Sequence, residues 1–232
     1  MISKERPVPW VLDDVAASYP HFIILFMFYL VRTPSWFIRL NSSLLWNIPT
    51  EQKELYLTFD DGPHETATPF VLDQLKTYNA RATFFCLGKN VKAYPKIYER
   101  ILDEGHTVGN HTFNHLNGWK TNNNTYMRDI AEAAKYIDSK LFRPPYGKLS
   151  PFVSKLLRSL NYRIVMWEIL SGDFDTDVTP EKCLEHVVLY SRPGSVIVFH
   201  DSTKAWQRMQ FALPKVLQHF NEHGFNFKGI LQ

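Results

Sequence analysis

The sequence predicts an α/β fold, an incomplete (β/α) barrel of about seven parallel strands, because short strand-like runs alternate with amphipathic helical segments. A second observation supports this fold: polar and reactive side chains follow most of the expected strands. In a (β/α) barrel the carboxyl ends of the strands converge on one mouth, so residues far apart in the chain can meet there.

The expected strands are apolar runs rich in β-branched and aromatic residues. They lie at 55–59, 82–87, 107–110, 142–143, 163–167, 196–199 and near 226–230. Three intervening segments repeat apolar residues every three or four positions, which is typical of an amphipathic helix. These segments lie at 130–141, 153–160 and 209–220.

The composition is that of one catalytic-sized domain. The chain has 232 residues, of which 45% are hydrophobic, enough to bury one sizeable core. A net charge of +3 from 26 basic and 23 acidic residues forms no basic stripe and argues against nucleic acid as a partner. Two cysteines, Cys86 and Cys183, form neither a disulfide framework nor a thiolate metal site. The sequence does not indicate an oligomeric state.

The N-terminal part predicts a separate extension, 1–54, before the catalytic domain at 55–232. Its apolar run at 22–31 is shorter than the about 20 residues that a membrane-spanning helix needs. Its flanks lack the basic region and small-residue cleavage pattern of a signal peptide. We expect an apolar arm that packs either on the main domain or on a membrane surface. The sequence does not decide the cellular compartment; the cell envelope and a membrane-associated location are the candidates.

The residues at the predicted strand ends are of the kinds that bind metals and transfer protons. They are Asp60 and Asp61, His111, Arg143, Asp173, and His200 with Asp201.

A metal site is the first chemistry that these residues suggest. His111 and His115 are four positions apart, which would place both on one face of a helical turn and let them share an ion. His219 and His223 have the same spacing, but we interpret them as the solvated surface of the last helix. Two histidines and one aspartate leave one tetrahedral position open for water, as in catalytic zinc sites.

A bound cation would also explain two adjacent carboxylates. One of Asp60 and Asp61 could bind the metal while the other acts as a base. Spacing alone allows either assignment. The competing interpretation is that Asp-Asp-Gly-Pro is only a turn, because Asp, Gly and Pro all favour turns.

Four motifs in this order resemble the polysaccharide deacetylase family, the fourth carbohydrate esterase family. They are TFDDGP at 58–63, HTFNH at 111–115, RPPYG at 143–147 and VFHD at 198–201. The resemblance covers about residues 55–230. It implies hydrolysis of N-acetyl groups on an amino-sugar glycan with a divalent metal, zinc or alternatively cobalt.

The resemblance also implies a role for each matching residue. Asp60 corresponds to the general base and Arg143 to the arginine that holds it. Asp61, His111 and His115 correspond to the metal ligands.

Three further positions complete the implied machinery. His200 corresponds to the general acid, and Asp173 to the carboxylate that orients it and raises its pKa, with Asp175 and Asp177 as alternatives for that carboxylate. Tyr146 occupies the position whose backbone N–H helps to stabilise the oxyanion.

The sequence departs from the family pattern at three positions. Phe174 stands where a Trp is usual, and a Phe can still form a wall of the substrate groove. Leu170 stands where a second Asp is common, and Val198 stands where a Leu usually lines the acetyl pocket, which predicts a slightly roomier pocket. Trp119 and Trp206 are expected in loops near the mouth, where sugar rings stack on aromatic faces. Trp167 is expected to fill the barrel.

Other function classes remain open. An amidase for a small non-carbohydrate amide could use the same groups, and a catalytically silent glycan-binding protein could keep the fold. A metal phosphoesterase fits less well, because the motifs lack additional basic residues. The sequence does not choose among chitin-like oligomers, peptidoglycan and other N- or O-acetylated glycans.

Overall fold

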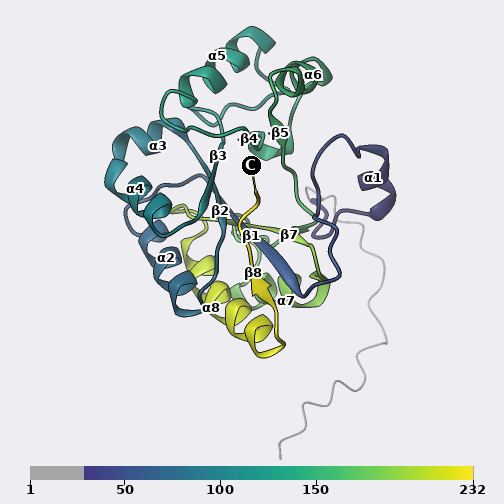
Figure 1. Ribbon diagram of the computed structural model, residues 1–232, viewed down its shortest axis with the longest axis vertical. Coiled ribbons are helices and arrows are strands. Elements are labelled where there is room, and N and C mark those ends of the chain that lie inside the picture. The colour runs from purple at the N-terminus through teal and green to yellow at the C-terminus, as the bar shows by residue number, and fades with distance from the viewer. Residues whose placement is uncertain (1–28, 232) are drawn as a thin grey trace, which may run out of the picture.

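The computed structural model describes residues 29–231, which form a parallel sheet surrounded by helices (Figure 1). Within them lie eight strands: β1 (Glu54–Asp60), β2 (Thr83–Cys86), β3 (Thr107–Asn110), β4 (Leu141–Phe142), β5 (Arg163–Ile164), β6 (Ile169–Leu170), β7 (Val196–His200) and β8 (Asn226–Phe227). Seven strands lie side by side in the order β5-β4-β3-β2-β1-β7-β6, and β8 pairs with the start of β1. Their pairings are parallel. The predicted incomplete barrel is therefore confirmed.

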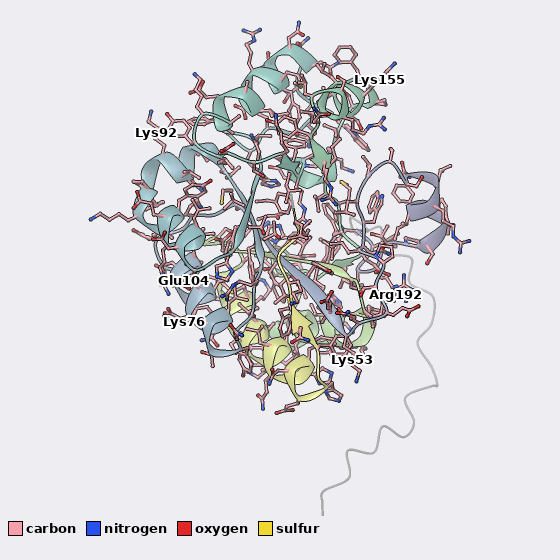
Figure 2. All side chains as sticks on the ribbon, viewed as in Figure 1. Lys53, Lys76, Lys92, Glu104, Lys155 and Arg192 are labelled. Carbon is pink, nitrogen blue, oxygen red and sulfur yellow. The ribbon has the colours of Figure 1, made fainter. Side chains whose placement is uncertain are left out.

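The helices cover the outside of this sheet. They are α1 (Ser35–Leu40), α2 (Ala67–Thr77), α3 (Gly88–Ala93), α4 (Pro95–Asp103), α5 (Asn123–Ala133), α6 (Pro151–Ser159), α7 (Pro180–Tyr190) and α8 (Trp206–Glu222), with a 3-10 turn at Pro145–Gly147. Charged side chains such as Lys76, Lys92 and Lys155 extend outward from the helices (Figure 2). No helix within residues 29–231 is both long enough and apolar enough to cross a membrane.

Two expectations about these elements are wrong. The predicted helical segment at 130–141 ends early, since α5 stops at Ala133 and Leu141 begins β4. Ile137 and Leu141 are nonetheless buried. Their apolar spacing of four residues therefore indicated burial correctly but did not indicate a helix. The short strand β6 was also missed, because it follows directly on the apolar run expected as a single strand at 163–167.

The side chains of the central strand β1 point alternately to the two faces of the sheet. Leu55, Leu57 and Phe59 pack against α2, α7 and α8 in the largest apolar cluster. Tyr56 lies on the opposite side, in a cluster with residues from β2, β4 and β7. Because successive side chains of a strand point to opposite faces, Asp60 shares the inward face with Tyr56 and Thr58. The residue at the end of β1 is therefore directed into the barrel.

The described part of the N-terminal extension packs along the open side of the barrel. The two edge strands are β5 and β6. Leu45 bridges to Val165 just after β5, and Arg32 bridges to Ile169 in β6. The segment thus connects both edges of the sheet and reduces the unpaired backbone that an open barrel leaves. Residues 1–28, which carry most of the predicted apolar run, lie outside the described residues.

The aromatic centre of the core generates the first prediction. Phe59 is fully buried, and its ring stacks against Phe84 at 5.1 Å and Phe199 at 6.1 Å between centroids. Phe59→Ala should lower the free energy of unfolding by about 3–5 kcal/mol, since it leaves a cavity among three strands. Urea denaturation measures this. Leu40→Ala, at a side chain that is 77% exposed, is the control and should stay within about 0.5 kcal/mol of the parent. Equal losses in both variants would contradict the assignment of this core.

Candidate active site

The carboxyl ends of the central strands lie next to one another in the sheet. Asp60 at the end of β1 pairs with Phe85 in β2 and with His200 at the end of β7. Asn110 at the end of β3 pairs with Phe142 at the end of β4. Parallel pairing in this register brings the residues after each strand to one mouth, as the sequence predicts.

Asp61, His111 and His115 form a compact group at this mouth. One candidate ligand atom from each lies within 4.8 Å of the others. Asp61 Oδ1 lies 3.1 Å from His115 Nε2 and 3.7 Å from His111 Nε2. The group therefore offers one carboxylate oxygen and two imidazole nitrogens, a donor set that suits zinc and other divalent transition metals.

The two histidines converge in a loop and not in the helical turn that their spacing suggests. Residues 111–115 follow β3 without forming a helix, and Thr112 and His115 have positive φ angles of 68° and 62°. The Asn110 side chain accepts a hydrogen bond from the Thr112 N–H at 2.8 Å. Asp129 of α5 accepts from the N–H groups of Phe113 and Asn114, both at 2.9 Å. These side-chain acceptors hold a tight loop that periodicity does not reveal.

Hydrogen bonds to the other ring nitrogens orient the imidazoles. His111 Nδ1 donates to the Arg143 carbonyl at 2.7 Å, so its Nε2 keeps a lone pair directed at Asp61. His115 Nδ1 lies 3.1 Å from the Tyr146 hydroxyl. Such outer partners commonly fix the tautomer of a metal-binding histidine.

The charges in the group also suit a cation. Burial lowers the pKa of His111 to about 4, against the opposing charges of Asp60 and Asp61. Burial alone would raise the pKa of Asp61, but the adjacent His115 imidazole and the charges of His200 and His111 bring it below its usual range. Asp61 Oδ1 is buried without a hydrogen-bond donor. His111 and Asp61 thus present free lone pairs at neutral pH, which metal binding requires.

Asp60 is held by a buried arginine. Arg143 Nη1 donates to Asp60 Oδ1 at 2.7 Å and to Thr58 Oγ1 at 2.7 Å. The other guanidinium nitrogens donate to the carbonyls of Val165 and Met166 at 3.2 and 2.9 Å. The Arg143 side chain is fully buried, so Asp60 supplies the counter-charge that its burial demands.

His200 is fixed by a second buried carboxylate. Asp173 Oδ2 accepts from the His200 backbone N–H at 2.7 Å, and Asp173 Oδ1 lies 2.8 Å from His200 Nδ1. Burial alone would lower the pKa of His200, but the charge of Asp173 and the hydrogen bond to it, with smaller contributions from Asp61 and Asp60, raise it to about 9. The imidazole is therefore protonated at neutral pH, with Nε2 free of the Asp173 contact.

The sequence assigns no role to Asp201, and the structure shows that it holds the turn after β1 through hydrogen bonds. It accepts hydrogen bonds from the Gly62 N–H at 3.0 Å and from the Thr68 hydroxyl. A Cβ on Gly62 would lie 2.0 Å from Asp201 Oδ2. Asp201 thus holds the turn that follows Asp60 and Asp61. The available signal was a carboxylate directly after His200, just beyond the apolar run at 196–199.

The predicted substrate-contacting residues occupy different environments. Phe174 packs edge-on against His200, with ring centroids 5.2 Å apart, and Val198 is buried in β7. Trp119 is 67% exposed and donates from Nε1 to the Leu149 carbonyl. Trp206 does not lie in a loop: it begins α8 and packs against Phe70 at 5.3 Å.

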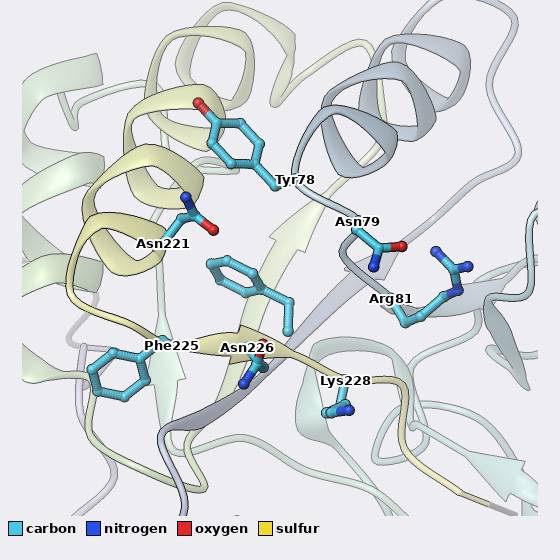
Figure 3. A pocket seen from close by; sticks show the side chains of 8 residues that line it. Tyr78, Asn79, Arg81, Asn221, Phe225, Asn226 and Lys228 are labelled. Atoms are coloured by element: carbon cyan, nitrogen blue, oxygen red, sulfur yellow. The ribbon is translucent and has the colours of Figure 1, made fainter.

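A separate hollow of about 260 Å³ lies at the opposite end of the strands, where β8 meets the start of β1 (Figure 3). Its lining contains asparagine, aromatic and basic side chains without a carboxylate or histidine. It therefore lacks the groups for the chemistry of the mouth.

The chain resembles enzymes that act on acetylated glycans. Residues 47–165 match the family described as polysaccharide deacetylase. A peptidoglycan-N-acetylglucosamine deacetylase of Bacillus cereus is 34% identical over 188 residues, which cover 78% of this chain and 88% of the relative. A chitooligosaccharide deacetylase of Azorhizobium caulinodans is 34% identical over 161 residues, 66% of this chain and 76% of the relative.

A crystal structure supports the same relationship. It is that of the Bc1960 peptidoglycan N-acetylglucosamine deacetylase in complex with 4-naphthalen-1-yl-N-oxidanyl-benzamide. It superposes with a TM-score of 0.78 at 33% identity and covers 85% of this chain and 95% of that chain.

The metal group generates the second prediction. His111→Ala and His115→Ala should each weaken zinc binding to the purified protein by at least about tenfold, because each removes one of three ligands. Titration calorimetry measures the affinity, and elemental analysis measures the metal content. His219→Ala and His223→Ala are matched controls from the other histidine pair with this spacing, and should bind zinc as the parent does. Full zinc occupancy in either of the first two variants would overturn the assignment.

Proposed function

The chain belongs to the polysaccharide deacetylase family, and on this premise we propose that it removes acetyl groups from an N-acetylated amino-sugar glycan by metal-assisted hydrolysis. The observation that carries the proposal is the meeting of three groups at one mouth: the Asp61–His111–His115 cluster, Asp60 on its arginine, and the Asp173–His200 pair. Amide hydrolysis needs an activated water, stabilisation of the developing oxyanion and a proton for the leaving amine.

The cluster would hold a single divalent cation, which we propose to be zinc, with cobalt as a functional substitute. Its one-carboxylate, two-imidazole donor set leaves coordination positions open, as catalytic zinc sites do. When bound, the cation would lower the pKa of a water molecule and polarise the acetyl carbonyl.

Asp60 is the proposed general base. Arg143 occupies its Oδ1 atom at 2.7 Å, which fixes the carboxylate plane and leaves Oδ2 to accept a proton from the attacking water. The neighbouring carboxylate of Asp61 faces the two imidazoles instead. The two adjacent aspartates therefore have different partners and different proposed roles.

His200 is the proposed general acid. Its Nδ1 faces Asp173, so Nε2 is the atom that can give a proton to the amine nitrogen as the carbon–nitrogen bond breaks. The backbone N–H of Tyr146 is the proposed donor to the oxyanion. The products are acetate and a free amino sugar.

The substrate class follows from the relatives and from the side chains around the mouth. The two curated relatives described above are named for peptidoglycan N-acetylglucosamine and for chitooligosaccharides, so we propose a glycan that contains N-acetylglucosamine. Phe174 and Trp119 offer aromatic faces on which a sugar ring can pack. Val198 is the proposed wall of the acetyl pocket. A protein that only binds glycans would have no use for a general base and a general acid, each with its own buried partner.

The third prediction tests the reaction and its base. With zinc supplied, the protein should release acetate from an N-acetylglucosamine tetramer or from peptidoglycan, and Asp60→Asn should lower kcat by about 10²–10⁴-fold, since an amide cannot take up the proton. A coupled acetate assay measures both. Asp103→Asn, on the exposed end of α4, is the control and should keep the parent rate. Acetate release only from small non-carbohydrate amides would contradict the glycan assignment, and undiminished activity of Asp60→Asn would remove the base.

The fourth prediction concerns pH. His200 must be protonated to act as the acid, and its pKa is raised to about 9 by Asp173, Asp61 and Asp60 against the effect of burial. We therefore expect kcat/KM to fall as the pH rises through about 9. In Asp173→Asn the largest raising charge is gone, so the fall should begin at lower pH. An alkaline limb at the same pH in both proteins would show that another group controls it.

A further inference from the structure

The start of the described chain pairs with the edge strand β6. Arg32 forms an antiparallel bridge with Ile169. The Leu170 N–H donates to the Val31 carbonyl at 2.8 Å, and the Thr33 N–H donates to the Glu168 carbonyl at 2.8 Å. Residues 31–33 thus extend the sheet by one short antiparallel segment that follows directly on Tyr29 and Leu30.

The direction of this segment decides where Tyr29 lies. Because the segment runs antiparallel to β6, its first residues lie at the carboxyl end of that strand, which is the mouth of the barrel. The ring of Tyr29 packs against Phe174 with centroids 4.9 Å apart, and Phe174 packs against His200 at 5.2 Å. The three rings therefore form a continuous row that ends at the proposed acid.

The turn at Gly172 leaves space for the Tyr29 side chain. Gly172 has a φ of 83°, and a Cβ there would lie 3.1 Å from the Tyr29 hydroxyl and 3.2 Å from His186 Nδ1. Burial and a hydrogen bond with Asp175 raise the pKa of Tyr29, so its hydroxyl is held in neutral form. Ring and hydroxyl are both fixed, while Tyr29 and Phe174 each stay only partly buried.

We propose that Tyr29 extends the aromatic surface that Phe174 offers to the substrate, so that the apolar face of an N-acetylhexosamine ring packs against both rings, an aromatic wall beside His200. The inference rests on the proposed function and makes the N-terminal segment part of the substrate site. Aromatic rings provide large rigid contact area for the C–H face of a sugar. The pairing of the N-terminal segment with β6 places Tyr29 beside Phe174.

The experiment measures binding and turnover of an N-acetylglucosamine tetramer by the full chain with zinc. Tyr29→Ala should raise both KM and Kd about five- to tenfold and leave kcat within about twofold, because a packing surface is lost while the reacting groups remain. Tyr29→Phe keeps the ring and should stay within about threefold of the parent. Leu30→Ala is the matched control from the adjacent residue, whose side chain is 58% exposed, and should change nothing.

Two further variants separate a wall from a merely structural role. Tyr29→Leu keeps much of the packed volume without an aromatic face, so KM should rise while the melting temperature stays close to that of the parent. Combining Tyr29→Ala with Phe174→Ala should raise KM by less than the product of the single effects, since both residues contribute to one surface. Fully multiplicative effects would contradict a shared wall.

The outcomes distinguish this inference from the proposed function. If the parent releases acetate but Tyr29→Ala and Tyr29→Leu keep its KM and Kd, the wall is refuted and the deacetylase function stands. If the parent binds the tetramer without releasing acetate, the function is refuted, and the change of Kd in the variants still decides on the wall. If the parent neither binds nor cleaves any N-acetylated glycan, both are refuted.

Discussion

The buried contacts of Arg143 are the constraint on which the rest of the site depends. Its guanidinium is fully buried and donates to Asp60 and Thr58 of β1 and to the carbonyls of Val165 and Met166 beyond β5. A buried charge is tolerated only when it is paired and its donors are satisfied. The same residue accepts the His111 Nδ1–H at its own carbonyl. The side chain of Arg143 thus fixes the proposed base, while its main chain fixes one of the proposed metal ligands, and the two cannot be displaced independently.

This arrangement explains how two adjacent aspartates coexist. Strand alternation directs Asp60 into the barrel and onto Arg143, where a fixed positive charge receives it. Asp61 leaves the strand with a φ of 85°, and its carboxylate turns to His111 and His115 instead. Its carbonyl accepts from the Asn90 side chain at 2.7 Å, and Asp201 holds the following Gly62. The backbone thereby directs the two carboxylates apart: Asp60 faces the Arg143 guanidinium, and Asp61 faces the imidazoles of His111 and His115.

The sequence predicted seven of the eight described strands and the residues at their ends, because strand runs and polar interruptions are local features. It could not predict how His111 and His115 meet, since their loop depends on Asn110 and on Asp129 from a helix further along the chain. The short strand β6 has no periodicity of its own, because two residues are too few to show one. No sequence pattern indicates the position of Tyr29 either. It lies beside Phe174 because the segment that follows it pairs with β6, about 140 residues further along the chain. Contacts between residues far apart in the chain cannot be predicted from the local pattern of the sequence.

The most direct test of the account is to follow the hydrolysis with an isotope. The zinc-loaded protein is incubated with an N-acetylglucosamine tetramer in ¹⁸O-labelled water, and the acetate and the sugar are analysed by mass spectrometry. If water attacks the acetyl carbonyl at this mouth, the released acetate carries one labelled oxygen from the solvent, the sugar gains a free amine, and a chelator stops the reaction until zinc is restored. Acetate without the label, release that a chelator does not affect, or cleavage between the sugars in place of deacetylation would contradict it.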